Sequence, residues 1–186
     1  MDIKNYLDST YLKKPEQAGL NSTENTEKVK DFIQEAIEHQ FKLIMIRPDH
    51  VALAKEMIVK AHSKVTIGTV ISFPEGTNTL EEKLAEAQTA IDNGADDLDF
   101  VCNYKAFIDG DLETVKTEIL QGTALGLQHN KIVKWIIEVA ALNEKQIIQI
   151  CSLIKKIVIS NFKEELYQNV YVKSSTGFYV TENNLP

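Results

Sequence analysis

Strand-like and helix-like segments alternate along almost the whole chain, and this alternation limits the possible folds more than any other feature. The strand-like segments are short apolar runs at residues 7–9, 41–46, 65–71, 98–102, 132–139 and 170–173. Between them, apolar residues at i, i+3 and i+4 predict helices with one buried face at about residues 25–40, 49–62, 79–94, 111–126 and 143–155. The third helix is expected to begin at a capping box of Thr79 and Glu82. Such an alternation implies a parallel sheet covered by helices, built from roughly six β/α units.

The same βαβ unit builds an open, doubly wound sheet and a closed barrel, so the periodicity leaves both folds open. No G-x-G-x-x-G segment follows a strand-like run, which weighs slightly against a dinucleotide-binding open sheet. The chain has 186 residues, 44% of them hydrophobic and 25% charged, which suits one globular domain with a core of ordinary size. Because no composition shift or repeat marks a boundary, we expect a single domain.

The charge and the cysteines exclude several classes of protein. A formal net charge of -7 argues against a surface built to bind nucleic acid or an anionic membrane, so neither is an expected partner. The N-terminus lacks the apolar stretch of a signal peptide, and no window approaches the roughly twenty apolar residues of a membrane span, which favours a soluble cytoplasmic protein. Cys102 and Cys151 lie in apolar runs without metal-ligand spacing, and no histidines form an i, i+4 pair. The sequence therefore predicts buried thiols and no metal site.

Charges inside segments that should be buried strands carry most of the information about function. Asp97 and Asp99 lie in DDLDFV, Lys134 and Glu138 in VKWIIEVA, and Lys173 in VYVKSSTG. Burying such a charge without a partner costs several kcal/mol, so each needs a compensating charge or a polar cavity. Because side chains alternate along a strand, Asp97 and Asp99 should share one face, and so should Lys134 and Glu138.

If those faces point inward, acids and lysines converge at one place. The alternative is a set of independent salt bridges or of charges at strand ends. A lysine amine that is desolvated and close to a second cation is held more readily in its neutral form. Neutral amines attack carbonyl groups, and an adjacent carboxylate can then move protons between the adduct and water. Residues 174–177 add hydroxyl groups and a glycine, where backbone amides can approach an oxyanion or a phosphate.

Five longer segments match motifs of one known enzyme family: LDSTYLKKPEQ, LIMIRPDHVALAKEM, TIGTVISFPEGTNTLEEKLAEAQTAIDNGADDLDFVCNYKAF, VKWIIEVAALNE and VYVKSSTGF. Together these segments are highly specific, whereas singly only the last and the long central one are. On these motifs the chain resembles the deoxyribose-phosphate aldolases, class I enzymes on the α/β TIM-type (β/α)8 barrel. The resemblance runs through nearly the whole chain and implies that about six of the eight β/α units are present in it.

The resemblance also implies roles for single residues. In the family, the lysine of the K-T/S-S-T-G segment forms the Schiff base, which assigns this role to Lys173. The second aspartate of the D-E/D-x-D segment serves in proton transfer, which points to Asp99. The lysine of the V-K-x-I-I-E strand orders the site and its water, which points to Lys134. The substrate-binding positions implied in the same way are Asp8, Thr176 and Gly177.

The implied reaction is reversible and splits 2-deoxy-D-ribose 5-phosphate into acetaldehyde and D-glyceraldehyde 3-phosphate, a step of deoxynucleoside catabolism. The resemblance implies no metal or organic cofactor. The expected partner is a small phosphorylated sugar, and association into a homodimer is left open. By this mechanism the Lys173 amine attacks the aldehyde, and the iminium acts as the electron sink for carbon–carbon cleavage. The enamine is then protonated with help from Asp99 and water, and hydrolysis frees acetaldehyde.

Two departures from the family pattern bear on these expectations. After the second strand the family often has C-V/I-N/Y-P, whereas this chain has MIRP, and we expect its Arg47 at the surface rather than near the phosphate or Glu75. The family also continues through two more strands with a second active-site lysine in a K-x-x-G-G segment. We therefore expect residues 1–186 to form a single β/α-barrel domain truncated before the last two strands, with open sheet edges and weak or no activity.

Two other functions are kept as alternatives, because one fold can host many functions. The first is another Schiff-base barrel lyase of phosphorylated sugars, which should not generate acetaldehyde. The second is an inactive fragment that self-associates through open sheet edges. In that case borohydride trapping with substrate would fail to label Lys173.

Overall fold

The computed structural model describes residues 3–181 of the chain. The fold divides into two compact units. The first contains the chain up to Val70 together with Thr89–Asp97, and the second contains Ile71–Gln88 together with the chain from Leu98 onward. The boundary crosses helix α4 (Leu80–Asp92), so the first residues of this helix belong to the second unit and its last residues to the first.

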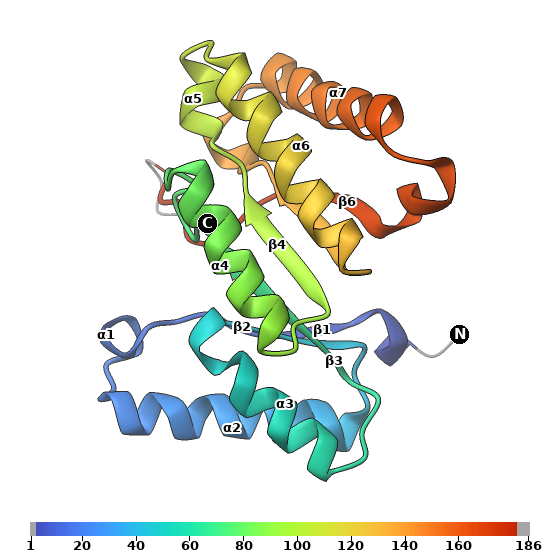
Figure 1. Cartoon of the computed structure of the whole chain (residues 1–186). Helices are drawn as coiled ribbons and strands as arrows, with labels where there is room; N and C mark the ends of the chain where they lie inside the picture. Colours follow the sequence, from blue (N-terminus) through green and yellow to red (C-terminus); the bar gives the residue numbers. More distant parts are fainter. Residues whose placement is uncertain (1–2, 182–186) are drawn as a thin grey trace. The chain divides into compact units, whose positions relative to one another are not determined.

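The first unit combines short parallel strands with two long helices. Its strands are β1 (Asp8–Tyr11), β2 (Leu43–Ile46) and β3 (Thr66–Ile71). Its helical segments are η1 (Ile3–Tyr6), α1 (Pro15–Ala18), α2 (Ser22–His39), η2 (Pro48–His50) and α3 (Val51–Lys60). The strands pair in sequence order, with Asp8 opposite Leu43 and Leu43 opposite Thr66. Helices α2 and α3 lie side by side, as Figure 1 shows in blue and cyan.

The apolar pattern of the sequence explains how this unit packs. Helix α2 begins after Asn21, whose side chain accepts from the Glu24 amide while the Glu24 carboxylate accepts from the Asn21 amide. One face of α2 is buried, and so is every residue of β2. The buried apolar residues of α2 are Val29, Ile33 and Ala36. The helix therefore covers the strand with the face that its apolar spacing predicts.

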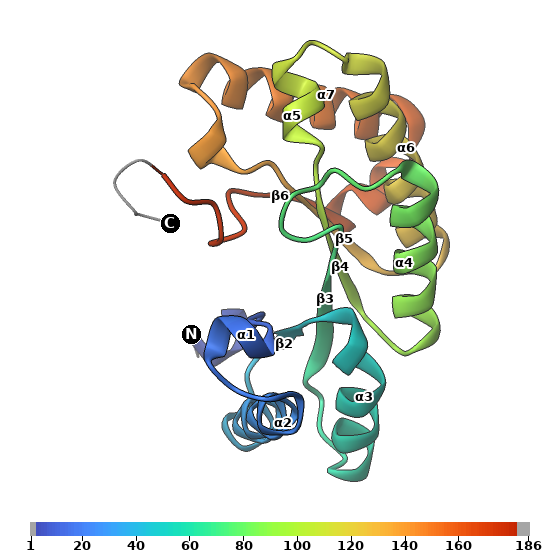
Figure 2. The ribbon, with the colours of Figure 1, turned by 90° about the vertical axis from the view of Figure 1, so that its left-hand side faces the viewer.

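The second unit contains the strands that hold most of the charged residues noted in the sequence. Its strands are β4 (Asp97–Val101), apart from Asp97, which belongs to the first unit, β5 (Ile132–Ile136) and β6 (Val170–Lys173). Its other segments are α5 (Tyr104–Ile108), α6 (Leu112–Gln128), η3 (Val139–Ala141), α7 (Glu144–Asn161) and η4 (Glu164–Asn169). The strand order is β4-β5-β6, and β5 and β6 run parallel. Helices α5, α6 and α7 form one group in both views (Figures 1 and 2).

Helix α6 approaches β5 closely because two of its residues lack a side chain. A Cβ atom at Gly126 would overlap the Val133 side chain, and one at Gly122 would lie 3.0 Å from the ring of Trp135. The indole Nε1 of Trp135 donates to the Thr123 hydroxyl at 3.0 Å. Trp135 is therefore a packing residue of the second unit.

The observed elements follow the predicted order, with differences at their ends. The capping box before α4 is confirmed, since the Thr79 amide donates to Glu82 Oε2 and the Glu82 amide donates to Thr79 Oγ1. The sixth strand has the predicted bounds, whereas α7 extends beyond the predicted end to Asn161. The prediction of a strand over residues 132–139 is wrong at its end, because β5 stops at Ile136. Helix α5 was not predicted.

The other expectations concern thiols and membrane segments. Cys102 and Cys151 are both free; Cys102 is buried as predicted, whereas Cys151 is partly exposed. Within residues 3–181, no helix combines the length and the apolar character that a membrane crossing requires.

Candidate active site

Two lysine amines meet one buried carboxylate in the second unit, and the three side chains come from neighbouring strands. Asp99 on β4 is completely buried. The Lys173 Nζ atom on β6 donates to Asp99 Oδ2 at 2.8 Å. The Lys134 Nζ atom on β5 lies 3.4 Å from Asp99 Oδ1. We refer to Asp99, Lys134 and Lys173 as the Asp99 group; it contains two amines for one carboxylate.

The register of the strands explains why the two amines face the same place. Lys134 pairs with Tyr171, and Ile136 pairs with Lys173. Because alternate residues share a face, Lys134 and Lys173 project from the same face of the sheet. The side chain of Lys173 is 35% exposed and that of Lys134 is 16% exposed, whereas Asp99 is closed to water. Part of the Lys173 side chain is therefore open to solvent, whereas the carboxylate beside it is buried.

Glu138 does not belong to this group, so the prediction that it shares a strand face with Lys134 is wrong. β5 ends two residues before it, and Glu138 has a left-handed backbone with φ of +51°, so the strand alternation no longer applies. Its carboxylate is buried, and Oε2 accepts from the Thr176 amide at 3.1 Å and from the Thr176 hydroxyl at 2.5 Å. Glu138 therefore contacts the segment that follows β6.

That segment, residues 174–178, carries two of the predicted substrate-binding positions. Thr176 is buried, and its hydroxyl oxygen accepts from the Phe178 amide at 3.0 Å while the hydroxyl donates to Glu138. Gly177 is exposed and has φ of +75°, a conformation that glycine adopts without a steric penalty. A Cβ atom at Gly177 would meet nothing within 4 Å, so its backbone faces open space.

The remaining predicted positions lie in the first unit and are not among the residues that the second unit brings together. Asp8 opens β1 and is exposed. Arg47 is half-buried, and its Nε atom donates to the Leu12 carbonyl oxygen at 2.8 Å. Glu75, considered as a partner of Arg47, instead contacts Lys105 Nζ at 2.6 Å.

A second buried lysine–carboxylate pair escaped the sequence analysis. Lys83 on α4 and Glu118 on α6 are both buried, with Nζ and Oε2 2.5 Å apart. Lys83 Nζ also donates to the Val101 carbonyl oxygen at 3.0 Å, and Glu118 Oε1 accepts from the Asn103 amide at 2.6 Å. The pair therefore holds the backbone at and just after the end of β4, the strand that carries Asp99. The signal was the position of Lys83, four residues before the buried Ala87 on the same helix face.

Burial dominates the electrostatics around this pair. It raises the pKa of the Glu118 carboxyl, an effect that the Lys83 ammonium and hydrogen bonds partly offset. Burial also raises the pKa of the Cys102 thiol well above its ordinary value, with a further contribution from the Glu118 charge. The thiol is therefore neutral at physiological pH and is not a candidate nucleophile.

Aromatic side chains pack at the carboxyl ends of β4 and β5. Tyr104 forms a buried cluster with Val101 and Ile136, and Tyr179 meets it edge-on with ring centroids 6.2 Å apart. Burial first, and then the Glu75 and Glu138 carboxylates, raise the pKa of Tyr104 to about 12. Its phenol therefore stays protonated at neutral pH.

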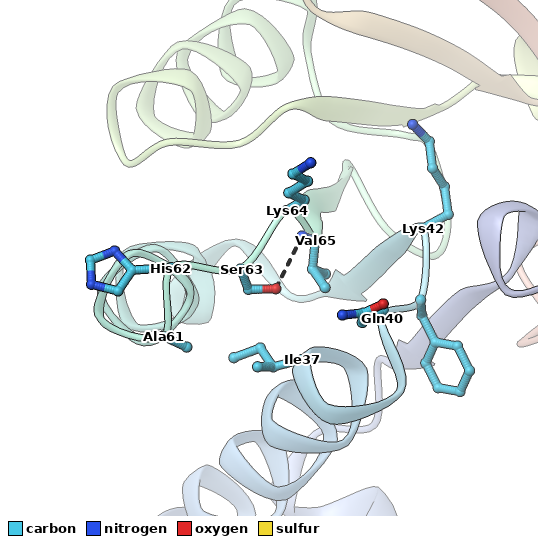
Figure 3. Close-up of a pocket in the computed structure, with 9 residues that line it drawn as sticks. Ile37, Gln40, Lys42, Ala61, His62, Ser63, Lys64 and Val65 are labelled. Carbon is cyan, nitrogen blue, oxygen red and sulfur yellow. Dashed lines mark hydrogen bonds between the residues drawn. The ribbon is translucent and has the colours of Figure 1, made fainter.

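The first unit contains a cavity of about 530 Å³ that we do not assign to catalysis (Figure 3). It lies where α2 and α3 end and where β2 and β3 begin, and its lining includes Ile37, Gln40 and Ser63. Figure 3 shows the Val65 amide donating to the Ser63 hydroxyl, a bond of 3.3 Å. In β/α folds catalysis occurs at the opposite, carboxyl ends of the strands.

The described residues contain no group of three or more His, Cys, Asp or Glu side chains that could hold a metal ion.

Comparison with known proteins identifies the family. The model of the family described as DeoC/LacD family aldolase matches residues 5–147. The chain belongs to the DeoC/LacD family of aldolases. Among DeoC/LacD relatives, a deoxyribose-phosphate aldolase from Thermococcus gammatolerans is 34% identical over 178 residues, 96% of this chain and 71% of the relative. One from Mycoplasmopsis pulmonis is 36% identical, with the same coverage of both chains. The resemblance predicted from the sequence motifs is therefore confirmed.

Solved structures agree with this family assignment. The tetrameric deoxyribose phosphate aldolase from Aeropyrum pernix has a TM-score of 0.75 and 26% identity, covering 96% of this chain and 66% of that one. A Coccidioides immitis structure attributed to the same enzyme has a TM-score of 0.77 and 27% identity, covering 96% and 63%. The predicted fold class is confirmed: the chain has the fold of the β/α-barrel DeoC aldolases, with six β/α units in its described residues. It spans 71% of the first curated relative and 63% of the Coccidioides chain.

Proposed function

We propose that this protein catalyses the reversible aldol cleavage of 2-deoxy-D-ribose 5-phosphate to acetaldehyde and D-glyceraldehyde 3-phosphate, through a Schiff base on Lys173. Membership of the DeoC/LacD family and relatives named deoxyribose-phosphate aldolase support the reaction class. The observation that carries the residue assignment is the 2.8 Å contact between the partly exposed Lys173 amine and the buried Asp99 carboxylate. An amine beside a proton acceptor is what carbonyl attack requires.

In the proposed mechanism, the neutral Lys173 amine attacks the aldehyde carbon, and the adduct loses water to give an iminium ion. Deprotonation of the substrate's C3 hydroxyl drives cleavage of the neighbouring carbon–carbon bond. The bonding electrons move into the iminium, which leaves an enamine on Lys173 and releases D-glyceraldehyde 3-phosphate. Protonation of the enamine carbon and addition of water then free acetaldehyde and restore the amine. No external oxidant or reductant is needed, because the iminium accepts the electrons.

The geometry supports separate roles for the other members of the Asp99 group. Asp99 contacts the Lys173 amine directly, so it can accept a proton from that amine and return one during formation and hydrolysis of the adduct. Lys134 lies 3.4 Å from the other carboxylate oxygen, so it can hold the Asp99 carboxylate in position. We assign proton transfer to Asp99 and ordering of the site to Lys134.

The substrate-binding assignments are also part of the proposal. The backbone at Gly177, four residues after Lys173, is exposed and is available to a phosphorylated substrate. The Thr176 hydroxyl is bonded to Glu138, so Thr176 would act mainly through its place in the backbone. Asp8 is assigned to the pocket by the family resemblance alone.

Borohydride trapping tests the proposal. Incubation with acetaldehyde and sodium borohydride should reduce the iminium and leave an ethyl group on Lys173, detectable by peptide mass spectrometry. The Lys145→Met variant, which changes an exposed lysine on α7, should label like the wild type, whereas Lys173→Met should not label. Release of acetaldehyde from 2-deoxy-D-ribose 5-phosphate would distinguish this enzyme from another Schiff-base lyase. Absence of label on Lys173 in the wild type would overturn the mechanism.

We also infer that the protein self-associates. The related enzyme from Aeropyrum pernix is tetrameric, and the second unit exposes large apolar side chains on α5, α6 and α7. These are Ile108, Leu112 and Ile148. Sedimentation equilibrium should give a mass above that of one chain, and a monomer at micromolar concentration would contradict the inference.

A further inference from the structure

Glu138 adopts a backbone conformation that its residue type does not favour. Its φ of +51° lies in the left-handed region, which residues with a Cβ atom enter at a steric cost. It also carries a carboxylate that is 1% exposed. Strained residues of this kind persist only where their surroundings hold them, and they concentrate at functional sites.

The contacts of Glu138 lead directly to the backbone beyond Lys173. On one side of it, the Ile137 amide donates to the Lys173 carbonyl oxygen at 3.0 Å. On the other side, the Val139 amide donates to the Ser174 carbonyl oxygen at 2.9 Å. The Glu138 side chain itself accepts both the amide and the hydroxyl proton of Thr176. Residues 173–176 are therefore fixed at three successive points by the turn after β5.

The bond to Thr176 also orients the next residues. Because the Thr176 hydroxyl gives its only proton to Glu138, its oxygen is left to accept from the Phe178 amide. This arrangement closes a turn around Gly177 and leaves the backbone of that glycine facing open space. The buried Glu138 carboxylate therefore fixes the conformation of the exposed turn around Gly177.

The second oxygen of Glu138 is inconsistent with a purely stabilising role. Oε1 is buried and has no hydrogen-bond partner in the described part of the chain. Burying a carboxylate with one unsatisfied oxygen lowers the stability of the fold. A neutral amide would offer Thr176 the same acceptor without the cost of desolvating a charge. A residue that lowers the stability of the fold in this way usually serves a function.

We propose that Glu138 is a positioning residue of the aldolase site. By fixing residues 174–178, it holds the Lys173 amine and the Gly177 backbone in one geometry, so that a single phosphorylated sugar reaches both. This inference rests on the proposed function and adds to it the residue that couples the Schiff-base lysine to the substrate-binding turn. The Glu138 side chain forms its hydrogen bonds with Thr176 and not with the Asp99 group, so its effect on catalysis is indirect.

The first test uses substitutions that separate position from stability. Glu138→Ala removes both hydrogen bonds and should lower kcat/KM by about a hundredfold, as expected for a small misplacement of reacting groups. Glu138→Gln keeps an acceptor for Thr176, so it should lose only about tenfold, because neutral hydrogen bonds are weaker than charge-assisted ones. The melting temperature of Glu138→Gln should equal or exceed that of the wild type. Glu164→Gln, at an exposed glutamate, is the matched control.

The second readout is the split between kcat and KM. In Glu138→Gln, KM for 2-deoxy-D-ribose 5-phosphate should rise more than kcat falls. Unphosphorylated 2-deoxyribose should be affected less, because it does not use the turn at Gly177. Borohydride with saturating acetaldehyde should still label Lys173. A loss of activity that merely follows a loss of folded protein would overturn the positioning role.

A variant pair at Thr176 keeps the inference testable if Glu138→Ala fails to fold. Thr176→Val removes the hydroxyl at constant shape and should lower kcat/KM, whereas Thr176→Ser should restore most of it. In the double variant Glu138→Gln/Thr176→Val, the losses should be clearly less than multiplicative, because both changes act on the same hydrogen bond. Multiplicative losses, or wild-type kcat/KM in Glu138→Gln, would overturn this inference alone. An unlabelled Lys173 in the wild type would overturn the proposed function and this inference with it.

Discussion

Two buried lysine–carboxylate arrangements lie in the same unit, and they differ in how the charges are balanced. Lys83 and Glu118 form a one-to-one pair, and each also bonds the backbone, at Val101 and at Asn103. The Asp99 group has one carboxylate for two amines, and one of these amines is partly open to solvent. In the first arrangement, both charged groups bind other groups of the protein. The second leaves the Lys173 side chain partly open to another molecule.

The difference shows that burial of a lysine does not by itself indicate chemistry. Lys83 is the more buried lysine, yet its amine lies between a carboxylate and a carbonyl oxygen and has no exposed approach. Lys173 is less buried but shares its carboxylate with a second cation. The useful criterion is therefore whether a ligand can reach the lysine.

The largest expected effect comes from removing the reactive amine. Lys173→Met should lower kcat/KM by at least about ten-thousandfold, as expected for loss of a nucleophile. Because Asp99 and Lys134 then form a balanced pair, the free energy of unfolding should change little or rise. Acetaldehyde release and urea denaturation measure the two quantities. A variant that is destabilised and still active would contradict both the assigned role and the comparison.

The next effect should appear in stability rather than in catalysis. Glu118→Gln leaves the Lys83 ammonium buried without a counter-charge, which should lower the free energy of unfolding by about 3–5 kcal/mol. The double variant Lys83→Met/Glu118→Leu should recover most of this loss, because no charge is left buried. Folded Glu118→Gln should still be labelled at Lys173 by borohydride. A loss below about 1 kcal/mol would indicate that this pair is screened like a surface ion pair.

Replacing the carboxylate of the Asp99 group should have a smaller effect on activity than removing Lys173. Asp99→Asn keeps the shape but cannot accept a proton, so kcat should fall by about a hundredfold or more, within the range of lost acid–base catalysis. Lys173 should remain chemically competent, so that high aldehyde concentrations still allow slow borohydride trapping. Stopped-flow measurement of iminium formation checks this. Wild-type kcat in Asp99→Asn would assign proton transfer to another group.

The smallest effect is expected at an exposed carboxylate, Asp111, which serves as a reference for the buried carboxylates Glu118 and Asp99. The Thr114 hydroxyl and the Thr114 amide lower the pKa of Asp111 at the start of α6. A carboxyl with a lowered folded-state pKa stabilises the fold above its unfolded pKa, and this contribution is lost as pH falls through the folded value. Asp111→Ala should therefore lower the melting temperature by a few degrees at pH 7. The gap to the wild type should close in acid, and a constant gap would show that the charge is not involved.

Sequence patterns were enough to predict the six strands, the five long helices and the three members of the Asp99 group. Strand segments with a charge among apolar residues are rare, so Asp99, Lys134 and Lys173 stand out without a structure. Alternation within a strand then places each charge on a face. What periodicity alone left open, an open sheet or a barrel, was decided by family motifs that reach beyond any single element.

The errors arose where local patterns stop being valid. Glu138 was assigned to a strand because the apolar run continues to Val139, but the left-handed turn after Ile136 rotates its side chain toward Thr176. Lys83 was overlooked because a lysine in an amphipathic helix is normally on the solvent side. Its burial depends on Glu118, 35 positions away, and such a partner cannot be read from the helix alone.

The close packing of α6 on β5 has a consequence for the charged group on the other side of the sheet. Val133 and Trp135 press against helix positions 126 and 122, and Lys134 stands between them on the opposite face. The distance between α6 and β5 therefore affects how far the Lys134 amine extends toward β4. One added methyl group at residue 126 would displace the strand and alter the electrostatic field at the carboxylate, although every ionisable group in the molecule would be unchanged.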